Sequence, residues 1–220
     1  MTNTLAAPQV TATLSRLFAA AAQDGDASAL LPGGALANAS ALEKADAAQD
    51  VYMPISPEAG HLLYALVRAS RPETVVEFGT SFGISTIHLA AAVTDNGTGR
   101  VVTTELSTAK VKAARANLEQ AGVGGVVTIL AGDARQTLAG VPGPIGVVLL
   151  DGWKDLCLPV LRLLESRLAP GAVVAGDDSS FASMAPYLEY VRDPAHGYVS
   201  VNFPVEDGME ISSWTGPQPS

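Results

Sequence analysis

The stretch Val75–Ser85 reads VVEFGTSFGIS and carries the strongest structural signal in the chain. A run of residues typical of a buried strand ends in an acid, Glu77, and leads into a loop with glycines at positions 79 and 83. Glycine allows a sharp turn and a close approach of the backbone to a ligand, and the helix that follows presents free N–H groups. The stretch is therefore typical of the floor of a nucleoside-cofactor site, and we expect Glu77 to face the ligand.

Strand and helix patterns alternate along the chain from this point. The strand patterns lie at 74–78, 101–105, 126–131, 145–150 and 172–175, and helical patterns lie between and after them at 85–93, 107–121, 158–168 and 184–191. Such alternation predicts parallel strands with right-handed crossovers. Residues 198–203 and 209–214 alternate apolar and polar side chains, which indicates a closing hairpin. We therefore predict an α/β fold: a Rossmann-like, doubly wound, mostly parallel seven-stranded sheet closed by a C-terminal antiparallel hairpin.

The N-terminal part has a different pattern. Residues 8–23 place apolar side chains on one helical face, but the next thirty or so residues are rich in alanine with weak periodicity. Ser56 followed by Pro57 is a good helix start. We expect a single domain over 1–220, in which 53–215 form the core and 1–52 are a helical or loose extension.

Composition limits the classes of function. The 220 residues carry a formal net charge of -9, which argues against a protein that binds the phosphates of DNA or RNA. The one cysteine excludes an internal disulfide, and no run approaches the roughly 18 apolar residues of a membrane span. We expect a cytoplasmic protein with a small-molecule ligand, no nucleic-acid partner and no membrane association. His61, His88 and His196 are scattered and receive no role.

Acids stand at the predicted strand ends, where open parallel sheets bind ligands. Glu105 follows the glycine loop at about the separation at which an acid accepts hydrogen bonds from ribose hydroxyls, although capping a turn is its alternative role. Asp133 has two equal interpretations, bonding an adenine amino group and capping the short helix after it. The glycine spacing lacks the Gly-x-Gly-x-x-Gly of pyrophosphate binding, and suits a cofactor with a cationic amino-acid tail that Glu77 can hold.

Three more acids follow two strands that we expect to be neighbours. Asp151 directly follows the strand at 145–150, and Asp177 and Asp178 follow the strand at 172–175. Each aspartate alone is commonly a turn or helix cap. Together they offer the hard oxygen ligands that Mg²⁺ prefers, so we favour a metal site.

Two residues beside Asp151 are candidates for the same cleft. Lys154 is close enough in sequence to reach it, and near a metal and a sulfonium its pKa would fall, so that its amine can act as a base. The alternative for Lys154 is a solvated surface charge. Trp153 is a candidate wall for a cofactor ring or an aromatic substrate, and equally a core residue.

The chain resembles the class I S-adenosylmethionine-dependent O-methyltransferases, specifically the metal-dependent group of catechol O-methyltransferase and the caffeoyl-CoA enzymes. The resemblance runs from about Met53 to Trp214. It rests on the motifs 77–85 (EFGTSFGIS), 104–105 (TE), 127–133 (VTILAGD), 151–155 (DGWKD) and 175–178 (AGDD).

The resemblance implies a role for each matching residue. S-adenosyl-L-methionine would be the methyl donor, with a divalent metal, Mg²⁺ or alternatively Mn²⁺ or Ca²⁺. A phenolic small molecule would be the acceptor, and the protein would be a homodimer. The methionine part would contact Glu77, Gly79, Ser81 and Ser85, the ribose Glu105, the adenine Asp133, Ala134 and Trp153, and the methyl donor Met53. Asp151, Asp177 and Asp178 would be the metal ligands, Lys154 and Asp151 the catalytic residues, and Asp151 would also contact the cofactor.

Two departures from the family pattern concern the site. Asp178 replaces the asparagine usual at the third metal position, which makes the site more anionic, and Gly152 stands where the animal catechol enzyme has histidine. The late glutamate that binds substrate in the catechol enzyme has no clear counterpart. The alternatives are a tRNA or other nucleic-acid methyltransferase on the same fold, an NAD-dependent oxidoreductase, and a catalytically silent binding module.

Overall fold

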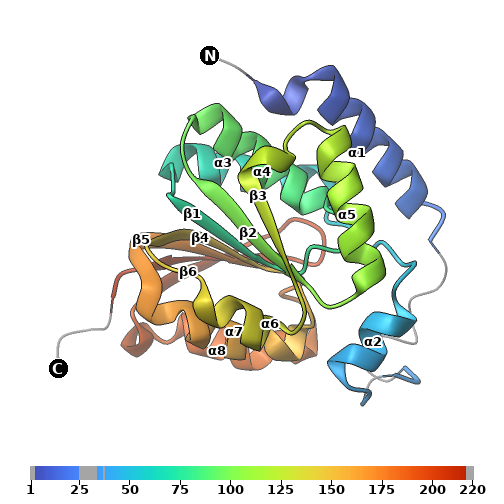
Figure 1. Ribbon diagram of the computed structural model, residues 1–220. Coiled ribbons are helices and arrows are strands. Elements are labelled where there is room, and N and C mark those ends of the chain that lie inside the picture. Colours follow the sequence, from blue (N-terminus) through green and yellow to red (C-terminus); the bar gives the residue numbers. More distant parts are fainter. Residues whose placement is uncertain (1–2, 25–33, 37, 217–220) are drawn as a thin grey trace.

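A seven-stranded sheet lies in the middle of the molecule, with helices against both of its faces (Figure 1). The computed structural model describes residues 3–24, 34–36 and 38–216. The strand order is β3-β2-β1-β4-β5-β7-β6. The strands are β1 (Thr74–Phe78), β2 (Arg100–Glu105), β3 (Val127–Ala131), β4 (Ile145–Leu150), β5 (Leu168–Gly176), β6 (Tyr198–Phe203) and β7 (Met209–Trp214). The first five pair in parallel, and β7 pairs antiparallel with both β5 and β6, which confirms the predicted fold.

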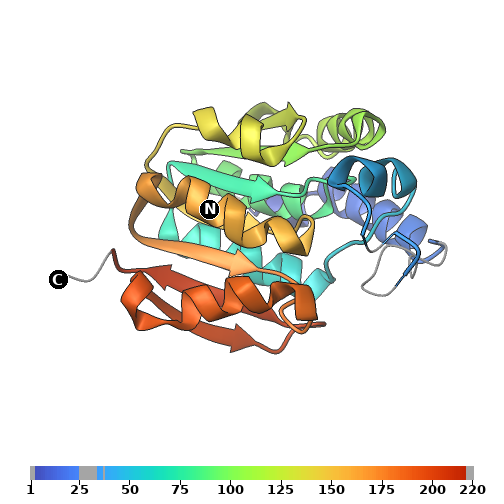
Figure 2. The ribbon, with the colours of Figure 1, turned by 90° about the horizontal axis from the view of Figure 1, so that it is seen from below.

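The helices form two layers, one on each face of the sheet. One face is covered by α1 (Pro8–Ala21), α3 (Pro57–Ser70), α4 (Ile84–Asn96) and α5 (Thr108–Gln120). The other face is covered by α6 (Ala134–Thr137), α7 (Cys157–Leu164) and α8 (Ala185–Arg192). The remaining helix, α2 (Ala41–Ala47), lies at the end of the molecule toward which the parallel strands point (Figure 2).

The central strands are apolar throughout because both faces of the sheet are covered. Adjacent residues of β1 show this directly, since Val75 packs in the core beneath α3 and α4 while Val76 packs in the core beneath α7. In β4, Leu149 and Leu150 divide between the two cores in the same way, and all four residues are 0% exposed. This double burial fixes the register of the strands, and thereby the places where their carboxyl ends meet.

Differences from the sequence expectations are concentrated at the ends of elements. The expected helix over 158–168 ends at Leu164, because Leu168 already pairs with Ile145 as the first residue of β5. In the N-terminal extension, α2 is a seven-residue helix that the weak periodicity did not reveal. Its first turn is held by a reciprocal capping box between Ser40 and Glu43. The expectation for residues 25–33 and 37 lies outside the described residues.

Within residues 3–24, 34–36 and 38–216, no helix is both long enough and apolar enough to span a bilayer.

Candidate active site

A cavity of about 640 Å³ opens at the carboxyl ends of the central parallel strands. Its floor is formed by the glycine loop after β1 and by the residues that follow β2, β4 and β5. Its roof includes α2 and the segment 52–55, so the N-terminal extension contributes to the site rather than preceding it. Nearly all the expected site residues line this cavity: Met53, Gly79, Ser81, Ser85, Glu105, Asp133, Ala134, Asp151, Trp153, Lys154, Asp177 and Asp178.

The glycine loop is pressed against the end of β4. Gly79 has φ = 105°, and a Cβ atom placed there would lie 2.5 Å from the carbonyl oxygen of Asp151. The N–H groups of Gly79 and Thr80 both donate to the carbonyl oxygen of Thr104 on β2. Only glycine satisfies the backbone conformation and the close approach together, so this position holds the loop in one place relative to two strand ends.

Glu77 does not face the cavity, contrary to our expectation. It is 0% exposed, and its two carboxylate oxygens accept hydrogen bonds from the hydroxyls of Ser85 and Thr86 at the start of α4. Burial raises the pKa of Glu77 to about 7, against the opposing effect of these hydrogen bonds. The side chain lies under the loop because α4 begins directly above this face of β1. It therefore joins β1 to the start of α4, the two elements that the glycine loop connects.

Glu105 lies at the cavity edge with both carboxylate oxygens engaged. Oε2 accepts the N–H of Ser81 at 2.9 Å, and Oε1 accepts the N–H of Ser107 at 2.8 Å. Each carboxylate oxygen has a second lone pair, so the group can still accept hydrogen bonds from a diol. Asp133 serves the capping role that we considered, since Oδ1 accepts the N–H of Arg135 and Oδ2 lies 2.6 Å from the Arg135 guanidinium.

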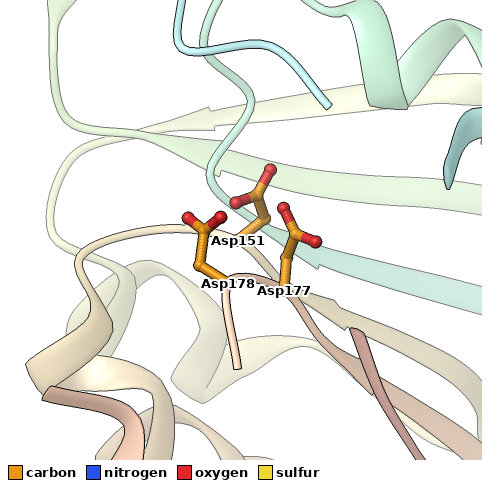
Figure 3. Close-up of side chains that lie close together, drawn as sticks. All are labelled: Asp151, Asp177 and Asp178. Atoms are coloured by element: carbon orange, nitrogen blue, oxygen red, sulfur yellow. The ribbon is translucent and has the colours of Figure 1, made fainter. Parts of the chain in front are cut away.

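Asp151, Asp177 and Asp178 converge at the adjoining ends of β4 and β5, as we expected (Figure 3). One oxygen from each carboxylate lies within 4.8 Å of those of the other two. The register explains this, because Leu150 pairs with Gly176 and the N–H of Asp177 donates to the carbonyl oxygen of Leu150. Burial, with the neighbouring carboxylate of Asp151 as the next contribution, raises the pKa of Asp177 to about 8.

Lys154 supplies a positive charge to this cluster. Its Nζ lies 2.9 Å from Oδ1 of Asp151 and 2.9 Å from Oδ2 of Asp178, with only 13% of the side chain exposed. Burial alone would lower the pKa of Lys154, but the two carboxylates outweigh it and the pKa is raised. The ammonium form is therefore favoured while the acids are ionised. Lys154 is not the solvated surface charge that was its alternative interpretation.

The donor set fits a divalent cation. Three carboxyl groups of one partly buried cluster stand beside the single ammonium of Lys154, and their oxygens are the hard ligands of Mg²⁺, Mn²⁺ and Ca²⁺. Asp151, Asp177 and Asp178 would hold such an ion, leaving further positions for water or substrate.

Three further residues of the cavity were not found from the sequence. Lys44 on α2 has its Nζ 5.8 Å from the ring centroid of Trp153, and Tyr52 stacks on Phe82 with centroids 3.9 Å apart. Lys110 in the first turn of α5 also lines the wall. Of these three residues, only Lys110 has a sequence position that suggests a place near the site, because it lies in the first turn of the helix that follows Glu105 at the end of a strand. The other two depend on how the N-terminal extension folds over the strand ends.

Comparisons with known proteins place the chain in a family. Residues 76–179 match a family model described as a methyltransferase domain. The chain is 34% identical to catechol O-methyltransferase of Mycobacterium tuberculosis over 149 residues, covering 67% of each chain. It is 30% identical to catechol O-methyltransferase B of Danio rerio over 178 residues, which are 74% of this chain and 66% of the relative. The chain thus spans about two thirds of the length of these relatives.

A solved structure shows the same similarity. The crystal structure of cofactor-bound Rv0187 from MTB superposes with a TM-score of 0.68 at 26% identity, covering 87% of this chain and 98% of that one. With the sequence matches, this shows that the chain belongs to the S-adenosylmethionine-dependent O-methyltransferases of the catechol and caffeoyl-CoA type. The resemblance stated from the motifs is confirmed.

Proposed function

We propose that this protein transfers the methyl group of S-adenosyl-L-methionine to one hydroxyl of a small aromatic vicinal diol, with the help of a divalent metal ion. The observation that carries the proposal is the convergence of Asp151, Asp177 and Asp178 beside the glycine loop, within one cavity that also contains Lys154. Family membership supports the methyl donor. The metal and the diol rest on the acid cluster and on the resemblance.

The cofactor is proposed to lie along the floor of the cavity. Gly79, Ser81 and Ser85 line the part of the wall that would take the methionine tail, and Glu105 lies where the ribose hydroxyls would follow. Asp133, Ala134 and Trp153 would then surround the adenine, and Met53 would lie near the methyl group. Because Glu77 is buried under the loop, it would support the tail-binding loop rather than bind the ammonium group itself.

The chemistry divides between the acids and the lysine. When bound, a divalent cation would act as a Lewis acid that lowers the acceptor hydroxyl pKa from its usual value of ~10. Asp151, Asp177 and Asp178 would fix the position of the acceptor oxygens in line with the methyl group, and such placement supplies much of the rate acceleration. Nζ of Lys154, held as an ammonium by two of these acids, would screen the departing proton, and would accept it once a bound cation neutralises those acids and frees the amine.

The acceptor is proposed to be a small molecule rather than a nucleic acid. The formal charge of -9 opposes binding to a polyanion, and the exposed acids Glu206 and Asp207 also line the cavity. We also propose that one domain carries the whole site, that it acts as a homodimer, and that it works in the cytoplasm. Light scattering tests the dimer, and a shift assay with bulk tRNA at low salt tests the exclusion of nucleic acid.

A methyl-transfer screen tests the proposed reaction. Purified protein is incubated with labelled S-adenosyl-L-methionine and a panel of catechols, caffeoyl derivatives and hydroxylated flavonoids, with and without EDTA. The proposal predicts a methylated product from at least one of the vicinal diols tested. It also predicts that EDTA abolishes turnover and that excess Mg²⁺ or Mn²⁺ restores it. Asp177→Asn should lose turnover, whereas the matched neutralisation Glu189→Gln, at an exposed position of α8, should retain it. A turnover rate that is the same with and without EDTA would refute the metal-dependent reaction.

A further inference from the structure

Lys110 is a buried cation in the wall of the cofactor cavity. The residue is 4% exposed and lies in the first turn of α5. Among the residues that the structure describes, its ammonium group has no hydrogen-bond or ion-pair partner within the usual distances. The contact that it does make is with the ring of Phe82, whose centroid lies 5.5 Å from Nζ. Nζ is not among the fully enclosed polar atoms, so the ammonium group opens to the cavity, where a bound ligand can supply the acceptor that the protein does not.

Three of the four acids whose charges act on Lys110 already have other hydrogen-bond or ion-pair partners, and the fourth is exposed. The four acids are Glu105, Asp24, Asp151 and Asp50, of which Glu105 has the largest effect. Both oxygens of Glu105 accept backbone N–H groups, Oδ2 of Asp24 accepts the N–H of Tyr52, and Asp151 is paired with Lys154. Asp50 is exposed. Because burial is the main effect and lowers the pKa of Lys110, the protein itself does not compensate fully for the buried charge.

We propose that Nζ of Lys110 donates a hydrogen bond to a ribose hydroxyl oxygen of the cofactor, while Glu105 accepts from the ribose hydroxyls. The inference rests on the proposed function, since it assumes a nucleoside cofactor in this cavity. A hydroxyl group both donates and accepts, a carboxylate only accepts, and an ammonium only donates. Glu105 and Lys110 together therefore satisfy both capacities of a ribose diol.

Two other roles for Lys110 make different predictions. The ammonium group would bind the carboxylate of the methionine tail if that tail reached toward Phe82. It would instead fasten the N-terminal extension if its main partners were Asp24 and Asp50, which lie on either side of α2 in sequence. The first role depends on the amino-acid tail of the ligand, and the second appears as a loss of stability in the ligand-free protein.

Calorimetric titration with two ligands separates these roles. S-adenosylhomocysteine has the ribose, the adenine and the tail, whereas 5′-methylthioadenosine lacks the tail. We expect Lys110→Met to weaken both ligands by a similar factor of about ten to one hundred, the loss typical of a hydrogen bond to a charged group. The matched control Lys112→Met, at an exposed position of the same helix, should leave both affinities unchanged. Lys110→Gln keeps a hydrogen-bond donor without the charge, so it should weaken the binding of both ligands less than Lys110→Met does. It also provides the test if Lys110→Met does not fold.

The results that overturn the inference are distinct from those that overturn the proposed function. A loss of affinity confined to S-adenosylhomocysteine would assign Lys110 to the tail and refute the ribose contact. Unchanged affinities with a lowered unfolding temperature of the ligand-free variant would assign it to the extension and refute the ribose contact as well. Failure of the unmutated protein to bind either ligand would refute the cofactor assignment itself, and the inference with it.

Discussion

Nζ of Lys154 lies 2.9 Å from Oδ2 of Asp178, a residue whose backbone has the left-handed value φ = 54°. This contact joins the end of β5 to the turn after β4, and the second contact of Lys154, with Asp151, completes the bridge. The ammonium group therefore shares its carboxylates with the proposed metal ion. A cation that binds there neutralises the acids that now hold Lys154, which links metal binding to the freedom of the amine.

Replacing Lys154 tests its part in the reaction. We expect Lys154→Met to lower the rate of methyl transfer by about 100-fold or more, the usual range for loss of a general base. Affinity for S-adenosylhomocysteine should change little, because the side chain faces the acids. Single-turnover rates and calorimetry measure the two quantities, with Lys112→Met as the control. A variant with the full rate would remove Lys154 from the mechanism.

Asp178 distinguishes this chain from the family pattern, in which asparagine is usual at the position. Asparagine tolerates left-handed backbone angles, so Asp178→Asn should fold with an unfolding temperature near that of the unmutated protein. Its oxygen still reaches the cluster but carries no charge, so a higher metal concentration should be needed for half-maximal turnover. Asp178→Ala should raise that concentration further. Equal metal requirements in all three proteins would show that Asp178 is not a ligand.

The close approach of Gly79 to Asp151 predicts a position-specific cost. Gly79→Ala adds a methyl group 2.5 Å from the carbonyl oxygen of Asp151, whereas the same change at Gly97, with φ = 69° and open space around it, adds backbone strain alone. Gly97→Ala should cost about 1 kcal/mol in the free energy of unfolding. Gly79→Ala should cost clearly more and should also weaken S-adenosylhomocysteine binding. Urea unfolding and calorimetry measure both, and equal costs at the two positions would contradict the packing described.

His88 predicts a pH dependence of stability. Its Nδ1 lies 2.9 Å from the carbonyl oxygen of Ile84, its ring packs against Gly60, and burial lowers its pKa from 6.5 to about 4. Between these values the unfolded chain binds more protons than the folded one, so stability is present above pH 6.5 and falls as the pH drops toward 4. The loss amounts to about 3 kcal/mol.

A comparison of two variants isolates that contribution. The difference in unfolding free energy between the unmutated protein and His88→Met should change with pH across this window. His61→Gln, at an exposed position whose ring contacts that of His88, should change the slope much less than His88→Met does. If the curves for the unmutated protein and His88→Met run parallel from pH 7 to 4, His88 is not the titrating group.

The sequence predicted the sheet and its acidic edge because both depend on local patterns with one geometric outcome. Continuous apolar strands require cover on two faces, and parallel strands bring Asp151 and Asp177 to one edge. The direction of Glu77 was wrong because the sequence does not reveal that α4 begins above that face of β1. For Asp133 the sequence could not choose between capping the next helix and bonding an adenine amino group, because both roles need an acid at this strand end. The structure shows the capping contact.

The residues that form the roof of the cavity could not be predicted from sequence patterns. The helix α2 has seven residues, too few to show helical periodicity, and its capping box is a short-range signal within an alanine-rich stretch. Lys110 was passed over because its burial depends on the ring of Phe82 and on the extension, which come from distant parts of the chain. Both belong to tertiary packing, whereas the predicted acids were found from their places at strand ends.

The most direct test of the central claim is a titration of Mn²⁺ into EDTA-treated, desalted protein, with the free ion followed by electron paramagnetic resonance. The account predicts one Mn²⁺ bound per chain, displaced by excess Mg²⁺, and no such binding in the double variant Asp151→Asn, Asp177→Asn. Glu189→Gln should bind as the unmutated protein does. If the unmutated protein binds no Mn²⁺, or if the double variant binds it equally well, these carboxylates do not form a metal site.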